Sequence, residues 1–221
     1  MKRRVTDELL DSDQGTPREI ALSLRDLRHI NDWFGGTRTT AALLGRIAKQ
    51  THTSCLSVLE VGSGRGDVPL AAKRNLRRLG IDLQITLLDR MWSHLPQDGV
   101  SAVAADTLRL PFGDGTFDVV SSSLFAHHFD PQELAVVAGE ALRVSRQAVL
   151  INDLLRSRLH LGLVYLSLPL FRSSITWKDA PASVRRAYTV AEMRSLLARL
   201  PTSRVEVSRH FLFRMGILIW K

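Results

Sequence analysis

The stretch VLEVGSGRGDVPL, residues 58–70, has the residue types and spacing of a ligand-binding turn. An apolar run ends at Glu60 and passes into Gly62, Gly64 and Gly66, which let the backbone turn sharply and let a ligand come close. The spacing G-x-G-x-G differs from the G-x-G-x-x-G of dinucleotide sites. A carboxylate beside the loop repels a pyrophosphate but pairs with an ammonium group. The alternative interpretation is a plain glycine turn between a strand and a helix.

Two further acidic residues follow the next two predicted strands. Asp89 ends the run ITLLD, where a carboxylate usually binds two ribose hydroxyls. Asp106 follows the third strand, where it can accept a hydrogen bond from an adenine amino group. Each alone is as often a loop or cap residue, but ligands of open α/β sheets bind beyond the carboxyl ends of the strands. Their joint placement therefore indicates one nucleoside-type site.

The elements that must position these residues alternate between strand and helix. Strands are expected at 56–61, 83–88, 101–104, 117–122, 147–152, 203–208 and 211–219. Helices are expected at 17–34, 39–49, 67–79, 92–95, after the capping box Asp130–Glu133, and after Thr189 with Glu192. This alternation predicts an α/β three-layer sandwich with a seven-stranded, mostly parallel sheet. The short joint between the last two strands predicts that the last strand is antiparallel.

Composition excludes several classes of protein. The single cysteine, Cys55, rules out an internal disulfide framework and a cysteine-rich metal site, and we expect a buried, structural thiol. No apolar stretch of a secretion signal follows the basic N-terminus, so we expect a cytoplasmic protein whose residues 1–16 are frayed. The net charge of +8 raises the question of nucleic-acid binding. Because no block of five like charges occurs, we expect no nucleic-acid partner.

With these motifs the chain resembles the class I S-adenosylmethionine-dependent methyltransferases. The resemblance covers residues 55–152, through VLEVGSGRGD, LLDRM, AADTLRLPFGDGTFDVV and EALRVSRQAVLINDL, and extends to the reversed last strand. It implies a Rossmann-like methyltransferase domain over 51–221 with a lid insertion at about 154–188, preceded by an N-terminal helical extension over 1–50. The implied cofactor is S-adenosyl-L-methionine.

The resemblance also implies which residues contact the cofactor. Those expected at the methionine moiety are Glu60, Gly62, Gly64 and Gly66; Asp89 is expected at the ribose, Asp106 and Thr107 at the adenine, and Ser63, Arg90 and Ser122 nearby. Methyl transfer from a sulfonium is an in-line displacement, for which the protein aligns the reactants and excludes water. No metal ion and no protein nucleophile is therefore expected.

The segment SSSLFAHHF, residues 121–129, bears on the methyl acceptor. Family members that methylate base amines or planar nitrogens typically carry an Asp/Asn/Ser-Pro-Pro-aromatic motif here, which this chain lacks. His127 and His128 stand at this place, and a histidine can take a proton from a phenol or enol hydroxyl as the methyl group arrives. The alternative is that one histidine is packed and the other solvated. We predict O-methylation with either histidine as the base.

The parts outside the shared core should select the substrate. The apolar run 159–171 predicts a helix that roofs the site, with packing on the sheet edge or docking on a membrane surface as alternatives. A lid loop over 177–189 is expected to place Trp177, Arg186 and Tyr188 against the substrate. The arrangement is similar to bacterial methyltransferases of quinones and polyketides, in secondary metabolism. The prediction is therefore a methyltransferase of a small apolar or aromatic hydroxyl compound.

Two other classes of function remain open. The positive net charge is compatible with an RNA or protein methyltransferase. A cofactor-binding partner protein without catalysis has the same glycine loop. The sequence leaves the oligomeric state and the acceptor molecule undetermined.

Overall fold

The computed structural model describes residues 1–12, 14–96, 99–200 and 204–221. Its strands are β1 (Cys55–Val61), β2 (Asp82–Asp89), β3 (Ser101–Ala104), β4 (Phe117–Ser123), β5 (Ser145–Leu154), β6 (Arg204–His210) and β7 (Arg214–Trp220). Its α-helices are α1 (Pro17–Trp33), α2 (Gly36–Gln50), α3 (Asp67–Arg77), α4 (Pro131–Val144), α5 (Arg158–Ser167), α6 (Ser174–Arg186) and α7 (Val190–Leu197). Single 3₁₀ turns are η1 (Leu10–Ser12), η2 (Trp92–His94), η3 (Ala126–His128) and η4 (Leu168–Leu170).

The seven strands form one sheet in the order β3-β2-β1-β4-β5-β7-β6. The first five of these run parallel, whereas β7 is antiparallel to both β5 and β6. The predicted sheet and its reversed last strand are confirmed. The strand order changes direction between β1 and β4, which is where open α/β sheets bind their ligands.

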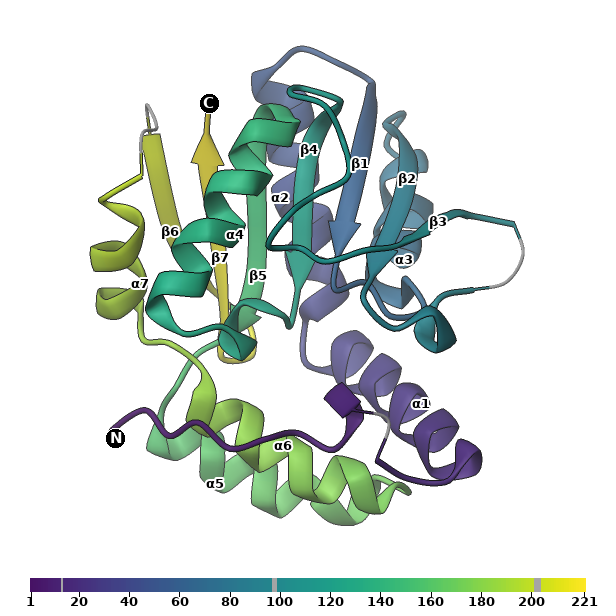
Figure 1. Ribbon diagram of the computed structural model, residues 1–221, viewed down its shortest axis with the longest axis vertical. Coiled ribbons are helices and arrows are strands. Elements are labelled where there is room, and N and C mark those ends of the chain that lie inside the picture. The colour runs from purple at the N-terminus through teal and green to yellow at the C-terminus, as the bar shows by residue number, and fades with distance from the viewer. Residues whose placement is uncertain (13, 97–98, 201–203) are drawn as a thin grey trace.

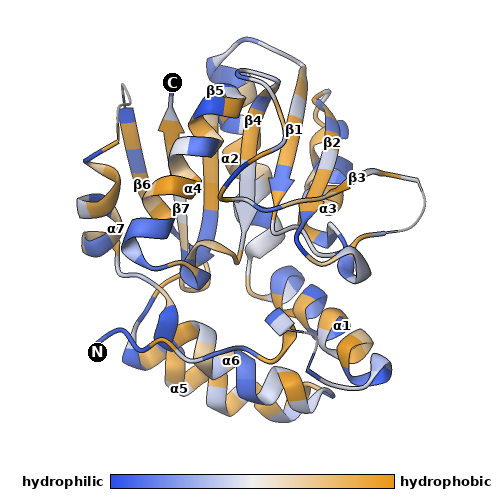
Figure 2. Ribbon diagram, viewed as in Figure 1, coloured by the Kyte–Doolittle hydropathy of each residue, from blue (hydrophilic) through white to orange (hydrophobic). Residues whose placement is uncertain are grey.

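Helices cover both faces of the sheet, as its alternating side chains require. Val58 packs with Leu44 and Ile47 of α2 on one face. Its neighbour Leu59 packs with residues of α4 and α7 on the other face, Ala138 among them. The central strands, which are mostly orange in Figure 2, therefore lie between two apolar layers. The three-layer arrangement brings the carboxyl ends of the parallel strands to one edge.

A further group of helices, α1, α5 and α6, lies beyond that edge (Figure 1). Asp26 of α1 accepts hydrogen bonds from the N–H groups of Arg172 and Ser173, which joins α1 to the segment before α6. The expected lid loop over 177–189 is mostly helix, so that prediction is wrong. Although Pro181 lies inside this helix, the buried side chains of Ile175 and Ala182, seven residues apart, give α6 an apolar face that packs.

The N-terminal segment also differs from the prediction of frayed residues. Residues 1–12, which we call the N-terminal strap, run across the front of α6 (Figure 1). The N–H groups of Leu9 and Leu10 donate to the carboxylate of Asp179 on α6, at 3.0 and 3.1 Å. The guanidinium of Arg3 donates to the carbonyl groups of His127 and Phe129. Both ends of the strap are thus anchored to the domain, one by the side chain of Arg3 and the other by backbone groups.

Smaller features complete the comparison with the sequence. The predicted capping box at Asp130 is confirmed, since its carboxylate accepts the N–H groups of Gln132 and Glu133. Cys55 is exposed, because it is the first residue of β1, so the prediction of a buried thiol is wrong.

The last strand begins at Arg214, after a turn at 211–213, and the expected strand residue 203 lies outside the described residues. None of the described helices is long and apolar enough to cross a membrane.

Candidate cofactor and acceptor site

A cavity of about 720 Å³ opens beyond the carboxyl ends of β1, β2 and β4. One side is formed by the loops that follow these strands. The other side is formed by the strap, α1, α5 and α6. The predicted cofactor residues that line it are Glu60, Gly62, Ser63, Gly64, Asp89, Arg90, Asp106 and Thr107. Three loops far apart in sequence therefore meet in one hollow.

Glu60 supplies a buried carboxylate to this cavity. Its side chain is 1% exposed, and its Oε2 atom has no hydrogen-bond partner. Burial raises the pKa of Glu60 to about 7, and the hydroxyl groups of Ser121 and Ser123 on β4 offset this only in part. An unpaired carboxylate oxygen in a buried position is suited to a positively charged ligand group.

The glycine loop takes backbone conformations that other residues rarely adopt. Gly62 has φ +62° and a Cβ atom there would collide with the ring of Phe125. Gly64 has φ +49° and a Cβ atom there would meet open space, so this backbone faces the cavity. Gly66, also at positive φ, precedes α3 and packs against Leu87 instead of lining the cavity. The loop thus presents bare backbone to a ligand.

Carboxylates after β2 and β3 hold the adjacent loops. Asp89 accepts hydrogen bonds from the N–H groups of Gly64 and Met91, both at 2.9 Å. Asp106 accepts the N–H group of Leu108 at 2.9 Å, beside the buried Thr107. The arrangement places an acidic side chain at the end of each strand, as the sequence predicted for a nucleoside.

Ser122 is the exception among the predicted cofactor residues. It lies beside Val137 and Ala138 of α4, on the side of β4 away from the main cavity. Its neighbour Ser123 lines the main cavity. The physical reason is the alternation of side chains along a strand, which exchanges the two faces at each residue.

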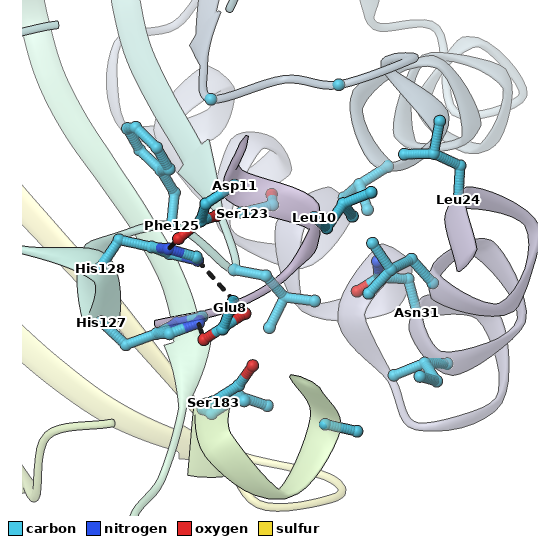
Figure 3. Close-up of a pocket in the computed structure, with 18 of the residues that line it drawn as sticks. Glu8, Leu10, Asp11, Leu24, Asn31, Ser123, Phe125, His127, His128 and Ser183 are labelled. Carbon is cyan, nitrogen blue, oxygen red and sulfur yellow. Dashed lines mark hydrogen bonds and ion pairs between the residues drawn. The ribbon is translucent and has the colours of Figure 1, made fainter. Parts of the chain in front are cut away.

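The two histidines line the same cavity, and each is oriented by a carboxylate. His127 is 2% exposed, and its Nδ1 atom lies 2.7 Å from Oδ1 of Asp153, at the end of β5. The Nδ1 atom of His128 lies 2.9 Å from Oδ2 of Asp11 in the strap. Figure 3 shows the two imidazole rings side by side and facing Glu8. The strap therefore supplies two of the three carboxylates around the pair.

The charges of this cluster act on one another. Burial alone would lower the pKa of His127, but the carboxylates of Asp153 and Glu8 raise it to about 10. Burial alone would raise the pKa of Glu8, but His127 and His128 hold it below its usual value. Arg186 adds a buried guanidinium, 3.6 Å from Glu8 and 3.5 Å from Asp11.

The predicted substrate residues are only partly brought to the cavity. Arg186 lines it, with its guanidinium engaged by the carbonyl groups of Thr6 and His128. Trp177 is half exposed and donates to the carbonyl group of Phe171 away from the cavity. Tyr188 is buried and donates its hydroxyl proton to the carbonyl group of Phe129. The sequence placed Trp177 and Tyr188 in a loop, whereas Trp177 lies in α6 and Tyr188 packs just after its end.

A buried arginine at the start of β7 completes the cavity wall. Arg214 is 1% exposed and donates to the side chain of Asn31 and the carbonyl group of Phe34. Its Nη1 atom has no hydrogen-bond partner, and the described residues give it no ion pair. Burial lowers the pKa of Arg214 to about 10, opposed by Asp153. It therefore remains a cation at neutral pH.

Sequence reasoning missed Glu8, Asp11, Asp153 and Arg214. Asp153 carried a usable signal, since it ends a predicted strand at the same edge as Asp89. The strap carried a weaker signal: acidic residues interleaved with Leu9 and Leu10 in a segment without helical spacing.

Residues 59–151 match a family described as a methyltransferase domain. No curated protein sequence matches the chain significantly. Among solved structures, the plantazolicin methyltransferase BpumL in complex with SAH is similar with a TM-score of 0.71, at 13% identity over 97% of this chain and 94% of that chain. The plantazolicin methyltransferase BamL, in complex with a desmethyl analogue and SAH, has a TM-score of 0.67 at 13% identity, over 93% and 91%.

The magnesium protoporphyrin IX methyltransferase of Synechocystis PCC 6803, with bound SAH, is similar with a TM-score of 0.54 at 14% identity, over 85% of this chain and 83% of that chain. At such identities the likeness shows the fold. The matched residues contain the glycine loop, Asp89, Asp106 and both histidines.

Proposed function

We propose that this chain, which is a class I S-adenosylmethionine-dependent methyltransferase, methylates a hydroxyl group of a small apolar or aromatic molecule. The observation that carries the proposal is the shape of the cavity. It joins the glycine loop to the histidine cluster within about 720 Å³, and small-molecule sites occupy roughly 300–1,000 Å³. A folded RNA or protein can place no more than a base or a side chain in such a space.

The residues at the glycine loop fit the cofactor. Glu60 offers an unpaired carboxylate oxygen for the ammonium group of the methionine moiety. The open space in front of Gly64 leaves room for the ligand, and Asp89 lies within hydrogen-bond reach of the same loop. When bound, the cofactor supplies the methyl group on its sulfonium. The chain then has to hold the acceptor in line with that methyl group and keep water out.

The rest of the cavity fits an apolar acceptor with an oxygen nucleophile. Its wall includes Leu24, Leu163, Val164 and Phe213. The carboxylates of the histidine cluster each have a positively charged or imidazole partner, whereas Arg214 has no ion pair among the described residues. An unpaired guanidinium disfavours a protonated amine and favours a neutral or anionic oxygen. The role of His127 or His128 as the proton acceptor stays a prediction.

Cofactor affinity should depend on pH through Glu60. Because burial raises its pKa to about 7, the free enzyme holds more of the neutral carboxyl as the pH falls below that value. Pairing with an ammonium group needs the carboxylate, so the Kd for S-adenosylmethionine should rise about tenfold per pH unit between pH 6.5 and 5.5. Calorimetric titration across this range measures the change.

Two controls isolate the carboxyl group. The variant Glu60→Gln should bind weakly and lose the pH dependence. Methylthioadenosine has the nucleoside and sulfur but no ammonium group, so its affinity for the native enzyme should stay flat over the same range. A Kd for S-adenosylmethionine that does not change from pH 7 to 5.5 would remove Glu60 from the ammonium site.

The acceptor class can be tested by product mass. Purified enzyme with the cofactor is offered matched aromatic compounds that carry a phenol, an enol, an amine or a thiol on the same ring system. We expect a single methyl group on the phenol or enol, with formation of S-adenosylhomocysteine. A mass gain on the amine alone would contradict O-methylation while leaving the methyltransferase activity intact. Methylation of RNA or a folded protein at a higher rate would overturn the small-molecule proposal.

A further inference from the structure

The histidine pair has the hydrogen bonds of metal-binding histidines. Nδ1 of His127 is held by Asp153 at 2.7 Å, and Nδ1 of His128 by Asp11 at 2.9 Å. A carboxylate on one ring nitrogen fixes the tautomer and turns the other nitrogen outward, as in the carboxylate–histidine–metal arrangement. Both outward nitrogens here are Nε2. The chain thus prepares two imidazoles in the same way from two different segments.

These two Nε2 atoms converge on one carboxylate, that of Glu8 (Figure 3). The distance from Nε2 of His127 to Oε1 of Glu8 is 3.6 Å, and that from Nε2 of His128 to Oε2 is 4.0 Å. Both exceed the length of a hydrogen bond. Neighbouring ligand atoms of a tetrahedral ion with bonds of about 2.0–2.1 Å lie about 3.3 Å apart. The two distances from the imidazole nitrogens to Glu8 are therefore close to those between atoms that bind the same ion.

Two buried atoms that form ion pairs but no hydrogen bond point into this gap. Nε2 of His127 and Oε1 of Glu8 are buried without a hydrogen-bond partner, and their side chains are 2% and 7% exposed. One ligand atom from each of Glu8, His127 and His128 lies within 4.8 Å of the others. Buried polar atoms without a partner are costly, and a cation between them would satisfy both.

The charge around the gap also suits a divalent cation. Glu8, Asp11 and Asp153 are carboxylates, and Arg186 is the guanidinium in contact with two of them. Asp153 and Glu8 raise the pKa of His127 to about 10, so this imidazole carries a proton in the metal-free protein. A doubly charged ion that takes the place of imidazole protons balances the charges of the three carboxylates and Arg186.

We propose that Glu8, His127 and His128 bind a divalent transition-metal ion of the zinc class, with a remaining position open to the acceptor cavity. Two imidazoles and one carboxylate form a ligand set typical of zinc and related ions, and a fourth position left to a ligand is the pattern of catalytic sites. The sequence predicted no metal ion, because methyl transfer from a sulfonium needs none, and it predicted that the segment containing Glu8 is frayed.

The chemical consequence rests on the proposed function. An acceptor hydroxyl loses its proton to solvent as it enters the open position, since the ion lowers the pKa of a bound hydroxyl. The two histidines then act as metal ligands in place of the base that the sequence predicted. The oxygen then forms a bond to the methyl carbon, the carbon–sulfur bond breaks, and its electron pair stays on sulfur. Since Glu8 belongs to the strap, the ion also ties the strap across the cavity. A chelating phenol or enol is the acceptor that fits best.

Metal binding can be measured without any acceptor or methyl transfer. The native protein is stripped with a chelator and titrated with Zn²⁺ by calorimetry, and with Co²⁺ followed by its visible absorption. We expect about one ion per chain and a cobalt spectrum typical of four-coordinate nitrogen and oxygen ligands. Absence of stoichiometric binding would overturn the metal site and leave the methyltransferase proposal standing.

Variants assign the ligands. Glu8→Gln, which preserves size, and His128→Asn, which removes Nε2, should each weaken Zn²⁺ binding by about 100-fold and alter the cobalt spectrum. His52→Ala, at an exposed histidine outside the cavity, and Cys55→Ser should leave the affinity unchanged. Folding is checked by circular dichroism and by cofactor affinity, which the Glu8 and His128 variants should retain. Equal Zn²⁺ affinity in the native protein and in both ligand variants would place the ion elsewhere.

Discussion

Replacing Asp89 by alanine is expected to raise the Kd for S-adenosylmethionine by at least about 100-fold. The carboxylate lies at the end of β2, where the sequence predicts the ribose hydroxyls, and it also accepts the N–H groups of Gly64 and Met91. Hydrogen bonds to a charged group contribute about 1.5–3 kcal/mol each, and about 1.4 kcal/mol corresponds to a tenfold change in affinity. Loss of the ribose contacts together with loss of the hydrogen bonds to the loop therefore raises the Kd by more than a hundredfold. Calorimetry with S-adenosylmethionine measures it.

The matched control stands at the other end of the same strand. Asp82 is the exposed first residue of β2, away from the cavity, so Asp82→Ala should leave the Kd within about twofold. Asp89→Asn keeps one acceptor oxygen and should fall between the two. A normal Kd in Asp89→Ala, with the melting temperature unchanged, would remove this residue from the cofactor site.

The cofactor half of the site was predictable because its signals are local. Glu60 and the three glycines lie within seven residues, and glycines at this spacing indicate a tight turn whose backbone a ligand can approach. Asp89 and Asp106 each follow an apolar run. The topology of a parallel sheet then brings these strand ends to one edge, so no knowledge of long-range contacts was needed.

The acceptor half was not predictable, because its contacts join distant segments. Glu8 and His127 are 119 positions apart, and no periodicity in the sequence connects them. The strap lacks a core-facing pattern of its own, and hydrogen bonds from its backbone to Asp179 hold it. Such bonds use backbone N–H groups, which nearly every residue has, so the amino-acid types of the strap do not predict them.

Ser122 and the α6 region show a second kind of failure. A strand's side chains alternate, so an error of one position in a predicted contact exchanges Ser122 for Ser123 and moves the hydroxyl to the opposite face. In α6, tertiary packing of an apolar face outweighed the helix-breaking signal of Pro181. The first error concerns which face of the sheet a strand residue points to, and the second concerns the packing of a helix. A local sequence pattern determines neither.

Replacing Asp179 by alanine is expected to lower turnover at least about tenfold and to raise the acceptor KM, while the Kd for S-adenosylmethionine stays within about twofold. The carboxylate accepts the N–H groups of Leu9 and Leu10, and each such bond to a charged group contributes about 1.5–3 kcal/mol. Without them residues 8–11 of the strap loosen, Glu8 moves away from the histidine pair, and water enters the cavity beside it. Steady-state kinetics and hydrogen exchange at residues 8–11 measure both effects.

The strap itself supplies the control for this experiment. Asp7→Ala changes an exposed carboxylate one residue before Glu8 and should leave turnover, KM and exchange near those of the native enzyme. Asp179→Asn keeps an acceptor oxygen for one N–H group and should recover part of the loss. Faster exchange in Asp179→Ala with unchanged turnover would mean that the strap opens without consequence for the reaction. Because the bonds from Leu9 and Leu10 to Asp179 do not involve the glycine loop, a parallel loss of cofactor affinity would instead indicate that the whole domain, and not the strap alone, had been destabilised.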